Sequence, residues 1–232
     1  PMPDLTRDEF IALARHKGPE TIAIPVALRL LADQLTPVLA YRRLVAPDER
    51  TAPSFLLESV EGGERQGRHS ILGAQPALEV VAFGSQVSVR SLSDRAGPLL
   101  TGPPAADPLM TLRAISAHLR LVHPPARRGS SLPACFLGGW CGFAGYDTVR
   151  YAEPAKLASP PRDDRHLPDL HFAFYDGVVI FDHVDKLVHL VQLAFVPPGA
   201  DAGSVYDAAI ARLRESLEQI EQPSMPPPLC VI

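Results

Sequence analysis

The sequence predicts an α+β fold in which largely antiparallel β-sheets pack with a few flanking helices. Two long apolar segments, 170–182 and 187–195, lie on either side of a short polar turn, which is typical of an antiparallel hairpin. Apolar residues recur at helical spacing over 109–122 and again over 203–222. Helices and strands do not alternate regularly along the chain, which favours antiparallel sheets over a parallel α/β architecture.

Composition excludes several classes of protein. The chain has 232 residues, of which 46% are hydrophobic and 21% charged, as in a globular protein. The net charge of −4 argues against a general nucleic-acid binder, and no apolar run is long enough to predict a membrane helix. The odd number of cysteines, at positions 135, 141 and 230, fits reduced thiols and predicts a cytoplasmic protein.

The N-terminal quarter predicts two helices and two strands. A capping-box pattern at Thr6–Glu9 begins a helix over about 6–16. The apolar segment 26–35, with charges at helical spacing, predicts a second short helix. Pro37 then begins a predicted strand that runs to Leu44. Residues 54–60 alternate as a strand, with Phe55, Leu57 and Ser59 on one face.

The middle of the chain predicts a hairpin and a third helix. Extended structure resumes at 70–73, and strands over 77–83 and 86–91 flank Gly84-Ser85, a pair that favours a type II′ turn. A loop over 92–108 ends in Asp107-Pro108, an N-cap followed by a proline in the first turn. One face of the helix that follows carries five apolar residues: Leu109, Leu112, Ile115, Leu119 and Val122.

The remaining segments set the predicted domain limits. Proline-rich residues 153–169 predict a long surface loop, and the final helix covers about 203–222. We expect one domain over 1–222, followed by a proline-rich tail over 223–232.

Two segments carry candidate functional residues. Residues 54–70 join an apolar strand bearing Glu58 and Ser59 to a glycine-rich loop with two arginines. This combination suits a small zwitterionic ligand with an apolar body, although a strand end with satisfied polar residues has the same pattern. The glycine-dense segment 138–150 favours close backbone packing. No pattern for a phosphate-binding loop, a zinc protease or a serine hydrolase is present.

Several motifs in one order resemble anthranilate synthase component I. They are Thr36-Pro37-Val38, Leu56-Leu57-Glu58-Ser59 with Val60–Arg65, Gly73–Pro76, Gly138-Gly139 with Gly142, Tyr146-Asp147 with Val149-Arg150, and Leu167-Pro168-Asp169 leading into Phe181-Asp182-His183. The similarity runs from about Leu5 to Gln222. Aminodeoxychorismate synthase component I is a related alternative, but the Glu58–Arg65 run looks closer to the anthranilate enzyme.

The resemblance implies a function for the whole enzyme and a role for this part of it. Such enzymes convert chorismate and glutamine-derived ammonia to anthranilate and pyruvate with magnesium, and tryptophan inhibits them. By resemblance, Ser59 contacts the inhibitor, and Glu58 lies beside it. The chorismate site and the magnesium carboxylates are expected in a catalytic half that this chain does not contain, so no catalytic residue is assigned.

The resemblance also implies partners. The expected ones are tryptophan, the catalytic half of component I and a glutamine amidotransferase subunit, with neither nucleic acid nor membrane among them. Two other functions stay open at this stage: a stand-alone small-molecule sensor that has lost catalysis, and a non-catalytic interaction module.

Overall fold

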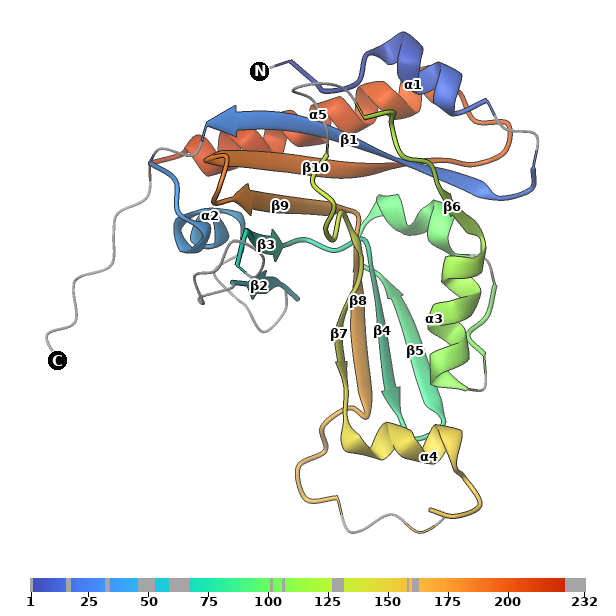
Figure 1. Ribbon diagram of the computed structural model, residues 1–232. Helices are drawn as coiled ribbons and strands as arrows, with labels where there is room; N and C mark the ends of the chain where they lie inside the picture. Colours follow the sequence, from blue (N-terminus) through green and yellow to red (C-terminus); the bar gives the residue numbers. More distant parts are fainter. Residues whose placement is uncertain are drawn as a thin grey trace, which may run out of the picture.

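The computed structural model describes residues 2–15, 18–31, 34–45, 53–58, 67–100, 102–105, 107–126, 132–157, 159 and 163–223. Within these ranges two sheets are joined end to end, and the smaller one projects away from the larger (Figure 1). The predicted α+β class with mostly antiparallel sheets is confirmed. The helices are α1 (Arg7–Leu13), α2 (Pro37–Leu44), α3 (Pro108–Ala117), α4 (Val149–Ala152) and α5 (Ala202–Glu221), with 3₁₀ turns η1 (Asp94–Leu99) and η2 (Tyr146–Thr148).

The large sheet has the strand order β2-β3-β9-β10-β1-β6. Its strands are β1 (Thr21–Leu31), β2 (Phe55–Leu57), β3 (His69–Gly73), β6 (Leu119–Leu121), β9 (Gly177–Asp182) and β10 (Leu187–Val196). Only the β1–β6 pair is parallel among these described strands. Both edge strands, β2 and β6, are three residues long, which limits the edge open to pairing with another chain.

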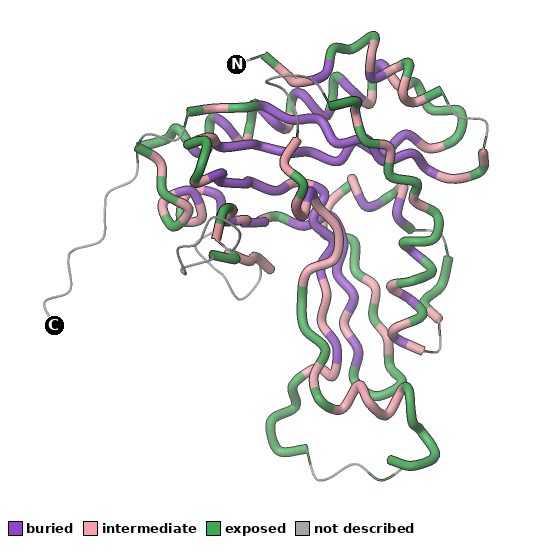
Figure 2. Tube along the Cα trace, in the orientation of Figure 1, coloured by how far each residue is buried: buried purple, intermediate pink, exposed green. Residues whose placement is uncertain are grey.

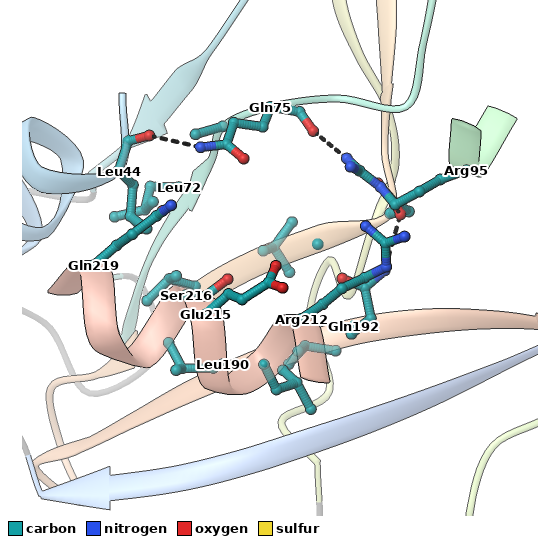
Figure 3. Close-up of a pocket in the computed structure, with 17 residues that line it drawn as sticks. Leu44, Leu72, Gln75, Arg95, Leu190, Gln192, Arg212, Glu215, Ser216 and Gln219 are labelled. Carbon is teal, nitrogen blue, oxygen red and sulfur yellow. Dashed lines mark hydrogen bonds and ion pairs between the residues drawn. The ribbon is translucent and has the colours of Figure 1, made fainter. Parts of the chain in front are cut away.

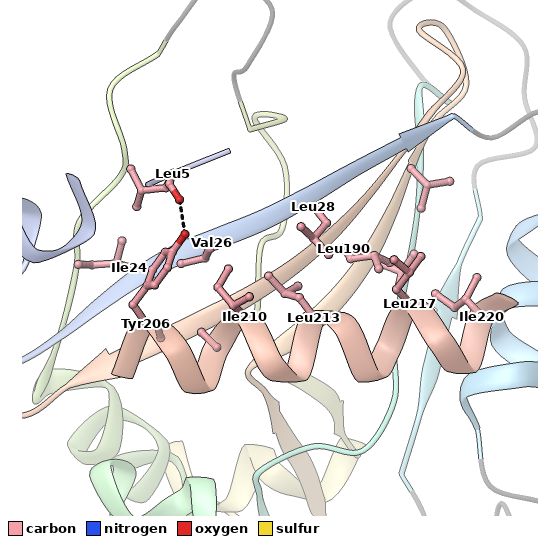
Figure 4. Close-up of a cluster of buried hydrophobic side chains, with 14 of the residues drawn as sticks. Leu5, Ile24, Val26, Leu28, Leu190, Tyr206, Ile210, Leu213, Leu217 and Ile220 are labelled. Carbon is pink, nitrogen blue, oxygen red and sulfur yellow. Dashed lines mark hydrogen bonds between the residues drawn. The ribbon is translucent and has the colours of Figure 1, made fainter. Parts of the chain in front are cut away.

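Helix α5 covers one face of the large sheet. Its apolar side contributes Tyr206, Ile210, Leu213, Leu217 and Ile220 to the largest cluster of buried side chains (Figure 4). The Tyr206 hydroxyl donates to the Leu5 carbonyl at 2.7 Å, which fixes the segment leading into α1. The predictions of α1, with its Thr6–Glu9 capping box, and of α5 are confirmed.

The prediction of a helix over 26–35 is wrong, because these residues belong largely to β1. Thr21 to Leu28 are all buried (Figure 2). Ile24 and Val26 pack toward α5, whereas Ala27 packs on the opposite face. A central strand buried on both faces has no polar–apolar alternation, so its periodicity resembles that of a buried helix.

Pro25 lies inside this strand without removing a hydrogen bond between the described strands. Opposite it, Leu193 donates its N–H to the Asp176 carbonyl at 2.7 Å, on the β9 side. In an antiparallel pair, the backbone N–H and C=O groups of two opposed residues point either toward each other or away from each other. The N–H of Leu193 points away from β1, so the nitrogen of Pro25 points away from β10. Strand β6 pairs only with Thr21–Ala23 and does not reach this position.

The prediction of a strand over 37–44 is also wrong, because these residues form α2. The Thr36 side chain accepts a hydrogen bond from the Leu39 N–H, and Pro37 occupies the first helical turn. An N-cap threonine followed by proline is a typical helix start. Arg43 donates to the Ile220 carbonyl at 2.5 Å and ties α2 to the end of α5.

The small sheet has the order β5-β4-β8-β7, and α3 covers one of its faces (Figure 1). Its strands are β4 (Leu78–Phe83), β5 (Gln86–Ser91), β7 (Gly139–Ala144) and β8 (Leu170–Tyr175). Trp140 packs edge-on against Phe174 and donates to the Ser116 hydroxyl at 3.0 Å, which fastens β7 to α3. The predicted β4–β5 hairpin is confirmed, and Gly84 has the positive φ of 55° that a type II′ turn requires at its first position.

The predicted strand 170–182 is two strands in two different sheets. β8 belongs to the small sheet and β9 to the large one, and Asp176 lies between them. The predicted third helix is shorter than expected, because α3 ends at Ala117 and Leu119 lies in β6. The single-domain assignment for 1–222 stays a prediction, and nearly all of the predicted tail lies outside the described residues. No helix in the described ranges is both long and apolar enough to span a bilayer.

Candidate functional site

The motif that carries the resemblance lies at the end of edge strand β2. Phe55 and Leu56 lie on opposite faces of the sheet, so the predicted alternation is confirmed for this strand. Leu57 is 54% exposed, and Glu58 follows directly, with an exposed side chain. Ser59, the other candidate residue, lies outside the described residues.

Phe55 anchors β2 to both sheets. Its ring packs edge-on against Tyr175 at the end of β8, with centroids 4.7 Å apart, and against Phe136 at 6.0 Å. Directly across the strand pair is Gly73. A Cβ at Gly73 would overlap the Phe55 ring and approach Tyr175 to 2.8 Å. The glycine therefore provides the space in which Phe55 fixes the start of the motif.

A groove of about 430 Å³ opens beside Phe55, between α2 and β7–β8. We call it the aromatic groove, and its principal lining residues are Tyr41, Ser54, Phe55, Phe143, His171 and Tyr175. The Tyr41 and Ser54 hydroxyls are hydrogen-bonded at 2.7 Å. The Phe143 and His171 rings meet edge to face at 6.0 Å. A groove with aromatic walls suits an apolar ligand body or an apolar partner surface.

Cys141 also lines this groove. Burial raises the pKa of its thiol, so the protonated and weakly nucleophilic form dominates at neutral pH. Burial raises the pKa of Cys135 to about 11 as well. These two thiols are therefore packing groups rather than nucleophiles.

A charged group lies where β3 begins and β9 ends, and we call it the strand-end cluster. Arg68 donates to the Asp182 carboxylate at 2.6 and 2.9 Å and to Asp185 at 2.8 Å. The Ser70 hydroxyl and His183 Nε2 are 2.7 Å apart. Burial by itself raises the pKa of Asp182, but hydrogen bonds from Arg68 and from two backbone N–H groups outweigh it and hold the value at about 2.

The strand-end cluster determines which charged side chains near β2 are available to bind a ligand. Arg68 is one of the two arginines of segment 54–70, and its guanidinium is occupied by Asp182 and Asp185. The other, Arg65, lies outside the described residues. Glu58, by contrast, is exposed and can accept hydrogen bonds from an ammonium group. In the described ranges, no three His, Cys, Asp or Glu side chains are grouped to hold a metal ion.

Two features of the site were missed by sequence reasoning. Tyr41 was placed on a strand, so its position beside Ser54 was not foreseen, although the Thr36-Pro37 helix start was available as a signal. The approach of Tyr175 and Phe136 to Phe55 has no local sequence signal, because 120 and 81 residues separate them along the chain.

Similarity to known proteins supports one family. No family model matches the sequence. The chain is 43% identical over 213 residues to anthranilate synthase alpha subunit 1, chloroplastic, of Arabidopsis thaliana. This match covers 88% of the chain and 35% of that protein. It is 33% identical over 209 residues to anthranilate synthase component 1 of Acetivibrio thermocellus, covering 90% of the chain and 38% of that protein.

A crystal structure of anthranilate synthase component I from Streptococcus pneumoniae matches 85% of the chain and 37% of that protein, at 26% identity and a TM-score of 0.46. The chain spans little more than a third of the length of the two curated relatives. Sequence identity of 33–43% over most of its residues shows that the chain belongs to the anthranilate synthase component I family.

Proposed function

We propose that this chain is the regulatory, tryptophan-binding part of an anthranilate synthase component I. The complete enzyme converts chorismate and glutamine-derived ammonia to anthranilate and pyruvate with magnesium, and tryptophan inhibits it. The observation that carries the proposal is the 43% identity over 213 residues to an anthranilate synthase alpha subunit. The activity, the substrates, the metal and the partners all belong to the proposal, because the chain spans only part of its relatives.

The geometry of β2 supports the inhibitor-binding role. The motif Leu56–Ser59 begins on a strand fixed by Phe55 and leads out of the sheet at Glu58, whose carboxylate is exposed. A zwitterionic amino acid needs an acceptor for its ammonium group and a donor for its carboxylate. Glu58 supplies the acceptor. The carboxylate donor has to be a backbone N–H or a side chain other than Arg68, because Arg68 is already paired.

The outer face of the small sheet supports a partner-binding role. Phe143 on β7 and Phe83 on β4 are both nearly half exposed on the face opposite α3. Exposed aromatic residues on a sheet face are typical of protein–protein contacts. The proposed partners are the catalytic half of component I and, in the assembled enzyme, a glutamine amidotransferase subunit.

Reconstitution tests the proposal. The full chain is mixed with the separately expressed remainder of a component I relative, and anthranilate fluorescence is followed with chorismate, ammonia and magnesium. We expect no product from either part alone and ammonia-dependent product from the mixture, inhibited by tryptophan. Product from the chain alone, or no product from a mixture that forms a complex, contradicts the proposal. Tryptophan binding without restored activity indicates a stand-alone sensor instead.

A further inference from the structure

A second cavity lies on the other side of the large sheet, between α5 and the junction of the two sheets (Figure 3). Its volume is about 100 Å³. Its apolar wall is formed by Leu44, Leu72, Val179, Leu190 and Leu213. Its polar side is formed by α5 and by residues of the junction, including Gln75, Arg95 and Asp176. One half of the cavity therefore favours hydrocarbon and the other half favours a polar group.

Arg95 and Asp176 add no net charge to this cavity, because they form an ion pair. Arg95 donates to both carboxylate oxygens of Asp176, at 2.8 and 3.2 Å, and also to the Gln75 carbonyl at 2.5 Å. Gln192 donates to the same carboxylate at 2.9 Å. Neither charge of this pair remains available to a ligand.

Arg212 is the remaining positively charged residue among those that line the cavity. It lies on α5 and lines the cavity, with 31% of its side chain exposed. In the described part of the chain its ion-pair partner is Asp94, at 3.9 Å, and the Asp94 side chain is 90% exposed. Such a long, solvated pair stabilises little, so the guanidinium keeps most of its capacity to bind a carboxylate.

Ser216 and Gln219 add polar groups on the same side of α5. They follow Arg212 by four and seven residues, so the three side chains share one face of the helix, and all three line the cavity (Figure 3). Neither Ser216 nor Gln219 has a side-chain hydrogen bond to another described residue. Glu215 stands beside them with an exposed carboxylate, which disfavours a ligand with two negative charges.

We propose that this cavity binds a short-chain monocarboxylate, with its carboxylate on Arg212 and Ser216 and its hydrocarbon against the leucines. A cavity of about 150 Å³ holds benzene, so this smaller one takes roughly four to six non-hydrogen atoms. Such a carboxylate occurs in simple acids and in small amino acids, whose ammonium group Glu215 can accept. The inference is independent of the proposed tryptophan site, which lies at the end of β2.

The test uses the full chain and propionate as the probe. Amide chemical shifts of Ser216, Gln192 and Asp176 are followed by NMR as propionate is added at constant ionic strength with chloride. We expect saturable shifts in the parent chain and at least a tenfold loss of affinity in Arg212→Gln, because a hydrogen-bonded charge is removed. Arg214→Gln is the matched control, since Arg214 lies on the same helix, is exposed and does not line the cavity.

A second variant tests whether the ligand lies inside the cavity, without changing the charge of its lining. Ser216→Leu keeps Arg212 but places a larger side chain into the cavity, so it is also expected to abolish the saturable shifts. Alanine as a second probe distinguishes the two ligand sources, because tighter binding of alanine than of propionate assigns the ammonium to Glu215. Shifts that do not saturate, equal binding by the two arginine variants, or the same shifts with chloride alone overturn the proposal.

Discussion

Arg95 and Asp176 form a two-pronged ion pair at the point where the two sheets meet. Arg95 Nε is 2.8 Å from Asp176 Oδ2, and Nη2 is 3.2 Å from Oδ1. The same Nη2 donates to the Gln75 carbonyl. Gln75 lies on the chain that passes from β3 to β4, and Asp176 on the chain that passes from β8 to β9. One arginine of η1 therefore joins both crossings between the sheets.

Loss of Arg95 is expected to destabilise the fold strongly. The Asp176 side chain is only 3% exposed, so Arg95→Gln leaves a buried carboxylate without its counter-ion, at a cost of about 3 kcal/mol. Urea unfolding measures the change. Arg7→Gln is the control, because its ion pair with Asp207 is 49% and 60% exposed and is worth about 1 kcal/mol or less. Equal losses in the two variants would show that the junction pair has no special role.

Gly73→Ala is expected to displace β2. The new methyl group overlaps the Phe55 ring and crowds Tyr175, and such overpacking costs about 1–3 kcal/mol. Thermal unfolding and the fluorescence of the tyrosines report the change. Gly97→Ala is the matched control, because a Cβ there meets nothing within 4 Å. The double variant Gly73→Ala with Phe55→Leu is expected to recover part of the loss; no recovery would place the cause elsewhere.

Asp182 is expected to make the chain sensitive to acid. Although burial alone would raise the pKa of Asp182, its hydrogen bonds from Arg68, Asp185 and Val184 hold the folded-state value at about 2, below the ordinary 3.8. A depressed carboxyl pKa contributes stability above the ordinary value, and this contribution is lost as the pH falls from about 4 to about 2.

Unfolding curves at several pH values check this. In Asp182→Asn, the free energy of unfolding is expected to fall less steeply over that pH range. In Arg68→Gln, the fall is expected to occur at higher pH. A parent-like profile in both variants would contradict the assignment.

Strand β1 and helix α2 show which secondary structure the local sequence can predict and which it cannot. Residues 26–31 were predicted as helix because β1 is buried on both faces and has no alternation to read. That burial depends on α5, nearly 180 residues further along the chain. Residues 37–44 were predicted as strand although Thr36 and Pro37 are a local helix start. The first error was unavoidable from local pattern, whereas the second was not.

In the candidate site, too, local features could be predicted from the sequence and long-range contacts could not. The alternation of Phe55 and Leu56 was predictable, because it is local and the strand lies at an edge with distinct faces. The pairing of Arg68 with Asp182 was not, because it joins residues 114 positions apart. That pairing decides whether Arg68 is available to a ligand, so the binding chemistry depends on contacts that periodicity does not reveal.

The isolated chain is expected to self-associate. Phe143 and Phe83 are 47% and 46% exposed on the outer face of the small sheet, and exposed apolar patches favour association. Sedimentation velocity over a wide concentration range measures this, and Phe143→Ser is expected to reduce it. Leu31→Ser is the control, since Leu31 is 77% exposed but lies at the end of β1 in the large sheet. A compact monomer at all concentrations would count against the prediction.

Ser59 is expected to set the sensitivity of the complete enzyme to tryptophan. The residue follows Glu58 directly in the motif that leads out of β2, and in the resemblance it is the inhibitor-binding serine. A hydroxyl bonded to a charged ligand group contributes about 1.5–3 kcal/mol, which is on the order of tenfold to a hundredfold in affinity. Ser59→Ala is therefore expected to raise the tryptophan concentration for half-inhibition by that factor while sparing turnover, because the proposed function assigns chorismate binding to the catalytic part of the enzyme.

The measurement is the inhibition curve of enzyme reconstituted from this chain and the catalytic remainder. Ser85→Ala, in the exposed turn between β4 and β5, is the matched control and is expected to leave the curve unchanged. Glu58→Gln extends the test, because it removes the acceptor proposed for the ammonium group and is expected to weaken inhibition as well. An unchanged midpoint in both Ser59→Ala and Glu58→Gln would contradict the inhibitor-binding role of these two residues, because loss of a hydrogen bond to a charged ligand group is expected to weaken its binding.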